Sequence, residues 1–300
     1  MTVEALRTPE ARFAALPGWG FEPGCVEDLT GFEGLRTAVV DEGPRQGPVF
    51  LCLHGEPPWS YLYRRMAPAF LAAGGRVVAP DLYGFGRSDK PVEDAVYTFD
   101  WHRRALLALV ERMDLRDLCL VCRDWGGLLG LTLPMAAPER WTRLIVMNTT
   151  LGMGQGATPG FVAWRDYVAK SPDLKVGALM ARACPQLTPE EVAAYDAPFP
   201  DVRYKAGVRR FPALVPVEPG MAGVETGREA ARFWSEAWAG ESFMAVGLAD
   251  PVLGGPAMAE LRGVIRGCPE PMELPEAGHF VQERGGPIAA AALARFGLGG

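Results

Sequence analysis

The sequence has 300 residues, of which 49% are hydrophobic and 22% charged, with a formal net charge of −6 at pH 7. A chain of this length can bury about three quarters of its unfolded surface, so it needs no disulfides or structural metals to fold. The negative net charge, without a cluster of basic residues, argues against nucleic acid and anionic membranes as partners. The sequence also contains no run of 18 apolar residues, which a membrane-spanning helix would need. Met1–Pro9 carries Glu4 and Arg7 where a signal peptide needs an apolar core, so we expect a cytoplasmic protein.

The six cysteines and three histidines limit the metal and redox sites that the chain could form. Cys119 and Cys122 have the C-x-x-C spacing of redox and metal sites, but residues three apart on a strand point to opposite faces. We therefore interpret both as small buried residues. The histidines, His54, His102 and His279, show no paired ligand spacing. We expect no metal and no cofactor.

The first half of the chain alternates apolar runs with amphipathic segments. Residues 1–24, rich in Pro and Gly, are expected to form an irregular arm. The first two runs predict a hairpin, and the later runs are continuous, as in strands buried on both faces. The predicted strands are Cys25–Leu29, Leu35–Asp41, Val49–His54, Arg76–Pro80, the start of Asp117–Ala136, and Arg143–Asn148; the predicted helices are Tyr61–Ala73, Thr98–Arg112 and the end of Asp117–Ala136. Such alternation builds a parallel sheet with right-handed crossovers.

The pattern changes at Gly152. From there to about Gly223 no apolar strand appears, and prolines punctuate short helical segments, predicted at Phe161–Lys170, Leu174–Ala183, Pro189–Tyr195 and Val202–Arg210. Alternation then resumes with helices at Thr226–Ala239, Met258–Arg266 and Pro287–Phe296 and strands at Phe243–Gly247 and Met272–Leu274. We predict a core domain of residues 1–151 and 224–300, with a helical cap domain of residues 152–223 inserted over the sheet.

The stretch Asp117–Gly130 reads D-L-C-L-V-C-R-D-W-G-G-L-L-G. An apolar run short enough for a buried strand ends near Asp124, two glycines follow, and the sequence then becomes helical. A strand that turns abruptly into a helix, with small residues around the corner, is the pattern of the nucleophile elbow of α/β-hydrolases. Asp124 stands at this corner, although an aspartate there could also be only a helix N-cap.

An aspartate at the corner carries different chemistry from a serine. With an unperturbed pKa of about 3.9 it is an anion at neutral pH. It can therefore displace a leaving group from a saturated carbon without a base. The product is an alkyl ester of the enzyme, which water must cleave, so a histidine is needed to activate that water.

Four residues of chemical interest follow predicted strands in separate segments: Glu56, Asp124, Asp250 and His279. The carboxyl ends of parallel strands are where open α/β sheets gather their ligands. Nucleophile, acid and histidine occur in the α/β-hydrolase order, with Asp250 expected to orient the imidazole of His279. The backbone N–H groups of Glu56 and Trp125 are expected to form an oxyanion hole. His54 is interpreted as structural.

Several segments resemble haloalkane dehalogenases: His54–Met66 (H-G-E-P-P-W-S-Y-L-Y-R-R-M), Ala79–Pro91, Val121–Gly127, Tyr195–Asp201, Gly278–Glu283 and the opening L-R-T-P-E-A-R-F. The similarity covers nearly the whole chain and is greatest to the branch with an aspartate acid. It implies an α/β-hydrolase fold, with a mostly parallel eight-stranded sheet flanked by helices and a helical cap inserted after the sixth strand. It also implies hydrolysis of a haloalkane to a primary alcohol, halide and a proton, without a cofactor.

The expected partners are therefore a small apolar halogenated substrate and a chloride or bromide ion, and we expect a monomer. The resemblance assigns halide binding to Trp125 and to Trp164 of the cap. An indole N–H is a donor only, which suits an anionic leaving group. Glu56 stands where a sister branch has a halide-donating asparagine, and a glutamate is not expected to replace that donor. Trp164 could otherwise be simple packing.

The sequence departs from these relatives at a few positions. Arg123 stands where they usually have glutamine, next to Asp124, and we expect it to pair with an acidic surface residue rather than to alter the local field. Leu128 lies where a pocket aromatic is sometimes found. These departures bear on substrate range.

Two other functions are compatible with the sequence. An epoxide hydrolase uses the same aspartate nucleophile together with cap tyrosines as proton donors, and Tyr167, Tyr195 and Tyr204 lie in the predicted cap. A non-catalytic homologue that binds a small apolar ligand usually lacks a member of the triad, whereas Asp124, Asp250 and His279 are all present.

Overall fold

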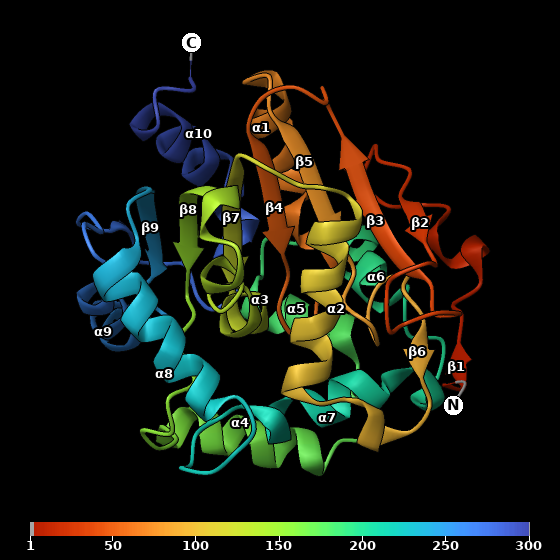
Figure 1. Ribbon diagram of the computed structural model, residues 1–300. Coiled ribbons are helices and arrows are strands. Elements are labelled where there is room, and N and C mark those ends of the chain that lie inside the picture. Colours follow the sequence, from red (N-terminus) through yellow and green to blue (C-terminus); the bar gives the residue numbers. More distant parts are fainter. Residues whose placement is uncertain (1–2, 300) are drawn as a thin grey trace.

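The computed structural model describes residues 3–299 and is built on one large sheet (Figure 1). The strands are β1 (Ala5–Leu6), β2 (Gly24–Val26), β3 (Thr37–Glu42), β4 (Val49–Leu53), β5 (Arg76–Pro80), β6 (Lys90–Pro91), β7 (Leu118–Arg123), β8 (Trp141–Met147), β9 (Glu241–Gly247) and β10 (Met272–Leu274). Eight of them form a sheet in the order β10-β9-β8-β7-β4-β5-β3-β2. Only β3 runs antiparallel to its neighbours, so the predicted fold class is confirmed.

Helices flank this sheet. The α-helices are α1 (Ala67–Ala72), α2 (Phe99–Arg112), α3 (Asp124–Gly130), α4 (Pro159–Ala169), α5 (Val176–Ala183), α6 (Pro189–Asp196), α7 (Ala206–Leu214), α8 (Val224–Arg232), α9 (Gly255–Val264) and α10 (Gly285–Arg295). The 3-10 helices are η1 (Glu10–Phe13), η2 (Ser60–Arg65), η3 (Asp94–Val96), η4 (Pro134–Ala136), η5 (Pro138–Arg140), η6 (Val202–Lys205) and η8 (Val281–Arg284); η7 (Phe233–Ala237) is a π-helix. This arrangement buries both faces of the parallel strands.

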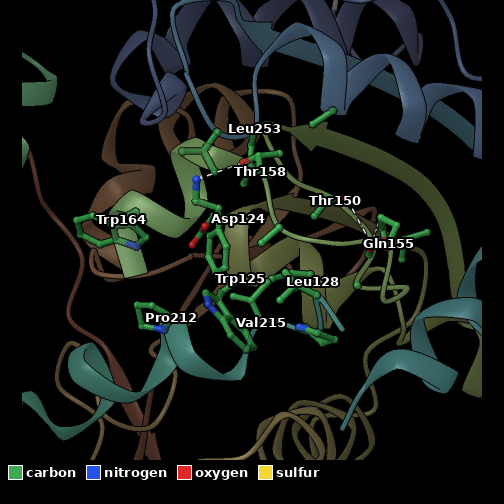
Figure 2. Close-up of a pocket in the computed structure, with 18 of the residues that line it drawn as sticks. Asp124, Trp125, Leu128, Thr150, Gln155, Thr158, Trp164, Pro212, Val215 and Leu253 are labelled. Atoms are coloured by element: carbon green, nitrogen blue, oxygen red, sulfur yellow. Dashed lines mark hydrogen bonds between the residues drawn. The ribbon is translucent and has the colours of Figure 1, made fainter. Parts of the chain in front are cut away.

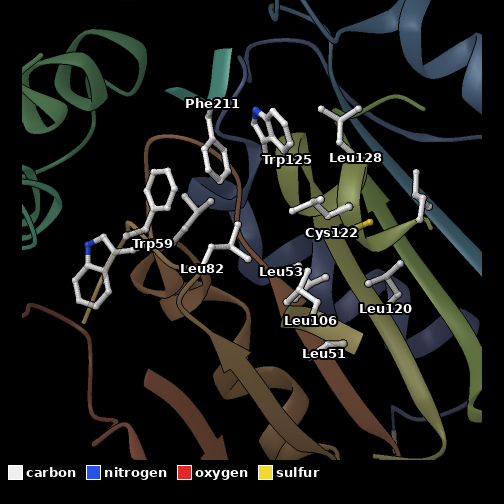
Figure 3. Packing of buried hydrophobic residues seen from close by; sticks show 14 of the residues in the cluster. Leu51, Leu53, Trp59, Leu82, Leu106, Leu120, Cys122, Trp125, Leu128 and Phe211 are labelled. Atoms are coloured by element: carbon white, nitrogen blue, oxygen red, sulfur yellow. The ribbon is translucent and has the colours of Figure 1, made fainter. Parts of the chain in front are cut away.

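Alternate residues of the central strands enter two separate cores. Leu51, Leu53 and Cys122 pack on the face covered by α2 and α3, as Figure 3 shows. Phe50 and Cys119 pack on the opposite face, against α1 and α10. The two cysteines of the C-x-x-C pair therefore lie in different cores, as the strand geometry predicts. Among residues 3–299, no group of three metal-ligating side chains is arranged to hold a metal ion.

The helical insertion follows β8, the sixth strand of the large sheet, and contains α4, α5, α6 and α7. In Figure 1, α4 and α7 lie beyond the carboxyl ends of β4 and β8. The insertion therefore lies over the edge of the sheet where a site is expected. The division of the chain into domains at residues 152 and 223 stays a prediction. Within the described residues, no helix is both long and apolar enough to span a bilayer.

Several segments differ from the sequence-based expectation. The predicted irregular arm contains β1, which pairs antiparallel with β6. The helix predicted at Tyr61–Ala73 is a 3-10 helix followed by α1, because Pro68 permits a helix only at its first turn. The helix predicted at Val202–Arg210 is likewise split into η6 and α7, which extends through Pro212. The helix predicted at Thr226–Ala239 is α8 followed by the π-helix η7.

Candidate active site

Asp124 lies at the turn between β7 and α3 with a backbone φ of +47°. For a residue other than glycine this conformation costs on the order of 1–3 kcal/mol. The following glycines let α3 pack closely enough to hold it. A Cβ on Gly126 would lie 2.0 Å from the carbonyl oxygen of Leu53, and one on Gly127 would lie 2.1 Å from the hydroxyl of Thr149. The small residues predicted around the corner are therefore required by contacts with neighbouring segments.

A backbone amide holds one oxygen of the Asp124 carboxylate. The N–H of Glu56, just after β4, donates to Asp124 Oδ1 at 2.7 Å, and the backbone amide of Trp125 helps to lower the pKa of the carboxyl group. A Cβ at Gly55 would lie 2.2 Å from Oδ1, so only glycine permits this approach. These are the two N–H groups expected to form the oxyanion hole.

His279 lies between the two aspartates. Its Nδ1 is 2.8 Å from Asp250 Oδ2, and its Nε2 is 3.5 Å from Asp124 Oδ2. The side chain of Asn148 donates to the same oxygen of Asp250 at 3.0 Å, and the N–H of Val252 donates to the other oxygen at 2.9 Å. The structure thus brings together the three residues predicted as nucleophile, base and acid.

Neighbouring charges determine the protonation states of Asp124, Asp250 and His279. Burial raises the pKa of Asp124, but Arg123 and His279 outweigh burial and lower it to about 2. Burial likewise raises the pKa of Asp250, and the contact with His279 brings it well below its usual range. Burial and Arg123 lower the pKa of His279, yet the two aspartates leave it above its ordinary value. Both carboxylates are therefore anions at neutral pH.

The expectation for Arg123 was wrong. Instead of pairing with a surface carboxylate, its side chain is completely buried. Its Nη2 donates to the carbonyl oxygen of His279 at 3.0 Å, and its guanidinium lies over the ring of Phe280. Its Nη1 lies 3.5 Å from Asp124 Oδ1. As the last residue of a buried strand, Arg123 cannot reach the surface.

A cleft lies between the end of the sheet and the helical insertion. Figure 2 shows Asp124 at its wall, with Trp125 and Leu128 from α3 on one side and Trp164 from α4 on another. Its apolar lining comes mainly from Trp125, Leu128, Leu151, Phe161, Trp164, Pro212, Val215 and Leu253. A mostly apolar concave surface with a few polar groups is typical of a site for a small molecule.

Glu56 contributes its side chain as well as its amide. The carboxyl group is buried, and burial, with the nearby charge of Asp124, raises its pKa well above the usual value. The indole of Trp164 acts in the opposite direction and lowers that pKa. Trp164 and Glu56 both line the cleft.

The other two histidines lie outside this chemistry. The Nε2 of His54 accepts a hydrogen bond from the N–H of Leu82, and its Nδ1 lies 2.7 Å from the carbonyl oxygen of Gly55. His54 thus holds the loop that carries the Glu56 amide. His102 is buried among aromatic rings.

Sequence reasoning missed the part played by Asn148. Its side chain joins Asp250 to Gly247 by accepting from the Gly247 N–H and donating to the Gly247 carbonyl oxygen. Its position in the sequence could have indicated this role, because Asn148 is the polar residue that ends an apolar strand at the edge where the other site residues lie.

An acidic elbow residue, a histidine and a second carboxylate at the carboxyl edge of this sheet define an α/β-hydrolase with an aspartate at the nucleophile position. In agreement, the family described as "alpha/beta hydrolase fold" matches residues 48–205. The haloalkane dehalogenase of Psychrobacter cryohalolentis is 39% identical over 98% of both chains. That of Mycobacterium marinum is 41% identical over 96% of this chain and 98% of its own.

Among solved structures, the haloalkane dehalogenase DpaA from Paraglaciecola agarilytica, described as tetrameric, is 52% identical. The match covers 97% of this chain and 98% of that one, with a TM-score of 0.96. This chain belongs to the haloalkane dehalogenase family.

Proposed function

We propose that this protein hydrolyses the carbon–halogen bond of small haloalkanes, with Asp124 as nucleophile, His279 as base and Asp250 as the acid that orients it. One observation carries the proposal. A charged carboxylate borders an apolar cleft, one of its oxygens is held by the backbone amide of Glu56, and a histidine lies beside the other. Family membership agrees with this reaction.

The first step is a displacement at carbon. Asp124 Oδ2 attacks the halogenated carbon, the new C–O bond forms, and the halide leaves with the electron pair of the broken bond. Because the pKa of Asp124 is about 2, no base is needed. The indole N–H groups of Trp125 and Trp164, both of which line the cleft, then bind the halide.

The second step is hydrolysis of the ester. His279 Nε2 takes a proton from water, which attacks the Asp124 carbonyl carbon, and the charge that develops on Oδ1 faces the amides of Glu56 and Trp125. Collapse breaks the bond to the alkyl oxygen, and the alcohol leaves with the proton from His279. Asp250 holds the imidazole in orientation and stabilises its charged form.

The cap tyrosines disfavour the epoxide hydrolase alternative. Tyr195 is buried and hydrogen-bonded to Arg64 and Glu283, and Tyr167 is exposed. No tyrosine lines the cleft within the described residues. A proton donor for an epoxide oxygen is therefore not in place.

Halide release from 1,2-dibromoethane and 1-chlorobutane tests the proposal. We expect turnover by the wild type and none by Asp124→Ala, with an unchanged circular dichroism spectrum, because Asp124 is the carboxylate on the cleft that lies beside the imidazole of His279. Hydrolysis of styrene oxide without halide release would favour the epoxide alternative. Retained turnover in Asp124→Ala would remove Asp124 as nucleophile.

The assembly and compartment remain predictions, namely a monomer and the cytoplasm. Since DpaA is described as tetrameric, light scattering on the purified protein is the decisive measurement for the first. A mass of four chains would overturn the monomer expectation.

A further inference from the structure

Arg123 is a buried cation with an unused hydrogen-bond donor beside the nucleophile. Its Nη2 is satisfied by the carbonyl oxygen of His279, and the face of its guanidinium lies 4.9 Å from the centroid of the Phe280 ring. Its Nε and Nη1 have no hydrogen-bond partner among residues 3–299. Since buried donors are nearly always paired, these two unpaired donors require an explanation.

Arg64 shows how the same fold pairs an arginine that is structural. Its Nη1 and Nη2 both donate to Glu283 at 2.7 Å, and Nη2 also donates to Glu191. Arg123 is equally buried, yet the carboxylate oxygen nearest to it in an ion pair is Asp124 Oδ1, at 3.5 Å. Nη1 therefore lies beside the oxygen that the Glu56 amide already binds, without a hydrogen bond to it.

We propose that Arg123 is a catalytic residue of the hydrolytic step, as a cationic third donor to Asp124 Oδ1 beside the amides of Glu56 and Trp125. This inference rests on the proposed function. Hydrogen bonds that serve catalysis are often long in the free enzyme and shorten in the transition state. A distance of 3.5 Å is consistent with such a contact.

The charge on Asp124 changes in opposite directions in the two steps. During alkylation the carboxylate loses its negative charge, so a nearby cation stabilises the starting state and slows the attack. During hydrolysis the ester is neutral and Oδ1 becomes negative, so the same cation stabilises the transition state. Arg123 therefore favours the second step at the expense of the first.

The same cation acts on the base. Arg123 opposes protonation of His279, so its loss should raise the pKa of the imidazole and move the acidic limb of hydrolysis to higher pH. The charge of Arg123 also lowers the pKa of the other titratable groups around it, which are His54, Glu56, Tyr63, Asp124 and Cys184. Because burial also raises the pKa of Glu56, the profile is repeated in a Glu56→Gln background.

The experiment separates the two steps in the full-length protein. We mix 1,2-dibromoethane with the wild type and with the variants Arg123→Lys, Arg123→Gln and Arg123→Met. Bromide release measures the alkylation step, and the intact mass after rapid quenching measures the amount of alkyl-enzyme. For Arg123→Met we expect the rate of hydrolysis to fall roughly ten- to a hundredfold. This loss is no greater than the loss caused by removing one oxyanion-hole donor. Alkylation should be unchanged or faster, so the adduct accumulates. Arg116→Gln, at an exposed and remote position, is the matched control.

Charge and packing are distinguished by the other variants. Arg123→Lys should keep most of the hydrolytic rate and the acidic limb of the wild type, whereas Arg123→Gln should lose much of the rate and shift the limb upward. Equal hydrolysis rates in these two variants, or no adduct in a folded Arg123→Met, would overturn the inference. Failure of the proposed function is a different result, since the wild type would then release no bromide.

Discussion

The proposed reaction depends on the different surroundings of the two oxygens of Asp124. Oδ1 is held by an amide and faces Arg123, whereas Oδ2 faces His279 at 3.5 Å. The oxygen on the imidazole side is the one expected to attack the substrate, because the other must remain in the oxyanion hole during hydrolysis. A single residue thereby serves as nucleophile and as the site of charge development.

His279→Gln should separate the two steps. Attack by Asp124 needs no base, but cleavage of the ester does. We therefore expect one bromide released per protein and a stable alkyl adduct in the intact mass spectrum after 1-bromobutane. An unmodified His279→Gln protein that releases no halide would contradict the role assigned to His279.

The pKa of His279 should change during the reaction. In the free enzyme, Asp250 and Asp124 raise it above about 6.5 against the effects of burial and Arg123. Esterification removes the charge of Asp124, so the pKa in the alkyl-enzyme should be lower. Since hydrolysis needs a neutral imidazole, its rate should fall as the pH drops through this lower value. Single-turnover profiles, compared with an NMR titration of the free enzyme, measure both; identical values would show that Asp124 does not affect His279.

Trp164→Phe isolates the proposed halide hydrogen bond from packing. A hydrogen bond to a charged partner contributes about 1.5–3 kcal/mol, so bromide affinity should fall roughly ten- to a hundredfold, together with turnover of 1-chlorobutane. Saturable quenching of tryptophan fluorescence by bromide measures the affinity. Trp101→Phe removes a partly buried indole that does not line the cleft and serves as the control. If both variants bind bromide as the wild type does, Trp164 is a packing residue.

At the scale of elements, α3 approaches β4 so closely that a methyl group cannot fit between them. The Cβ of Gly126→Ala would meet the carbonyl oxygens of Leu53 and His54 at 2.0 and 2.7 Å, and neither backbone group can move freely. We expect a loss of about 3 kcal/mol or more, at the upper end for overpacking, measured by urea unfolding. Gly263→Ala, in α9 with open space around it, should instead gain about 0.5–1 kcal/mol from helix propensity. Equal stability of the two variants would show that the elbow tolerates displacement of α3.

Sequence patterns predicted most of these elements because buried parallel strands read as continuous apolar runs. The positions of Asp124, Asp250 and His279 followed, since each ends or follows such a run. Arg123 was misjudged because a charge next to an apolar run gives no sign of the direction in which its side chain points. That Glu56 supplies no halide donor stays a prediction, although burial raises the pKa of its carboxyl group. The error at Arg123 concerns long-range contacts that no local pattern encodes.

At the scale of the molecule, a buried ionic network connects the helical insertion to the core. Arg64 on η2 binds Glu283 on η8 and Glu191 on α6, and the hydroxyl of Tyr195 on α6 also hydrogen-bonds Glu283. Because η8 begins two residues after His279, the same contacts that hold α6 also fix the segment that carries the proposed base. The position of the insertion and the position of the imidazole are therefore coupled.

Glu283→Gln tests this coupling. Removing one partner of a buried pair typically costs about 3–5 kcal/mol; since Arg64 keeps Glu191, we expect a loss near 3 kcal/mol in urea unfolding. Glu191→Gln, whose side chain is 11% exposed against 1% for Glu283, should cost less. Hydrogen exchange supplies the second measurement, because local opening of a shared network should expose its members together. Amides of α6 and η8 should exchange faster in Glu283→Gln than in the wild type, whereas acceleration confined to η8 would show that the network does not hold the insertion on the core.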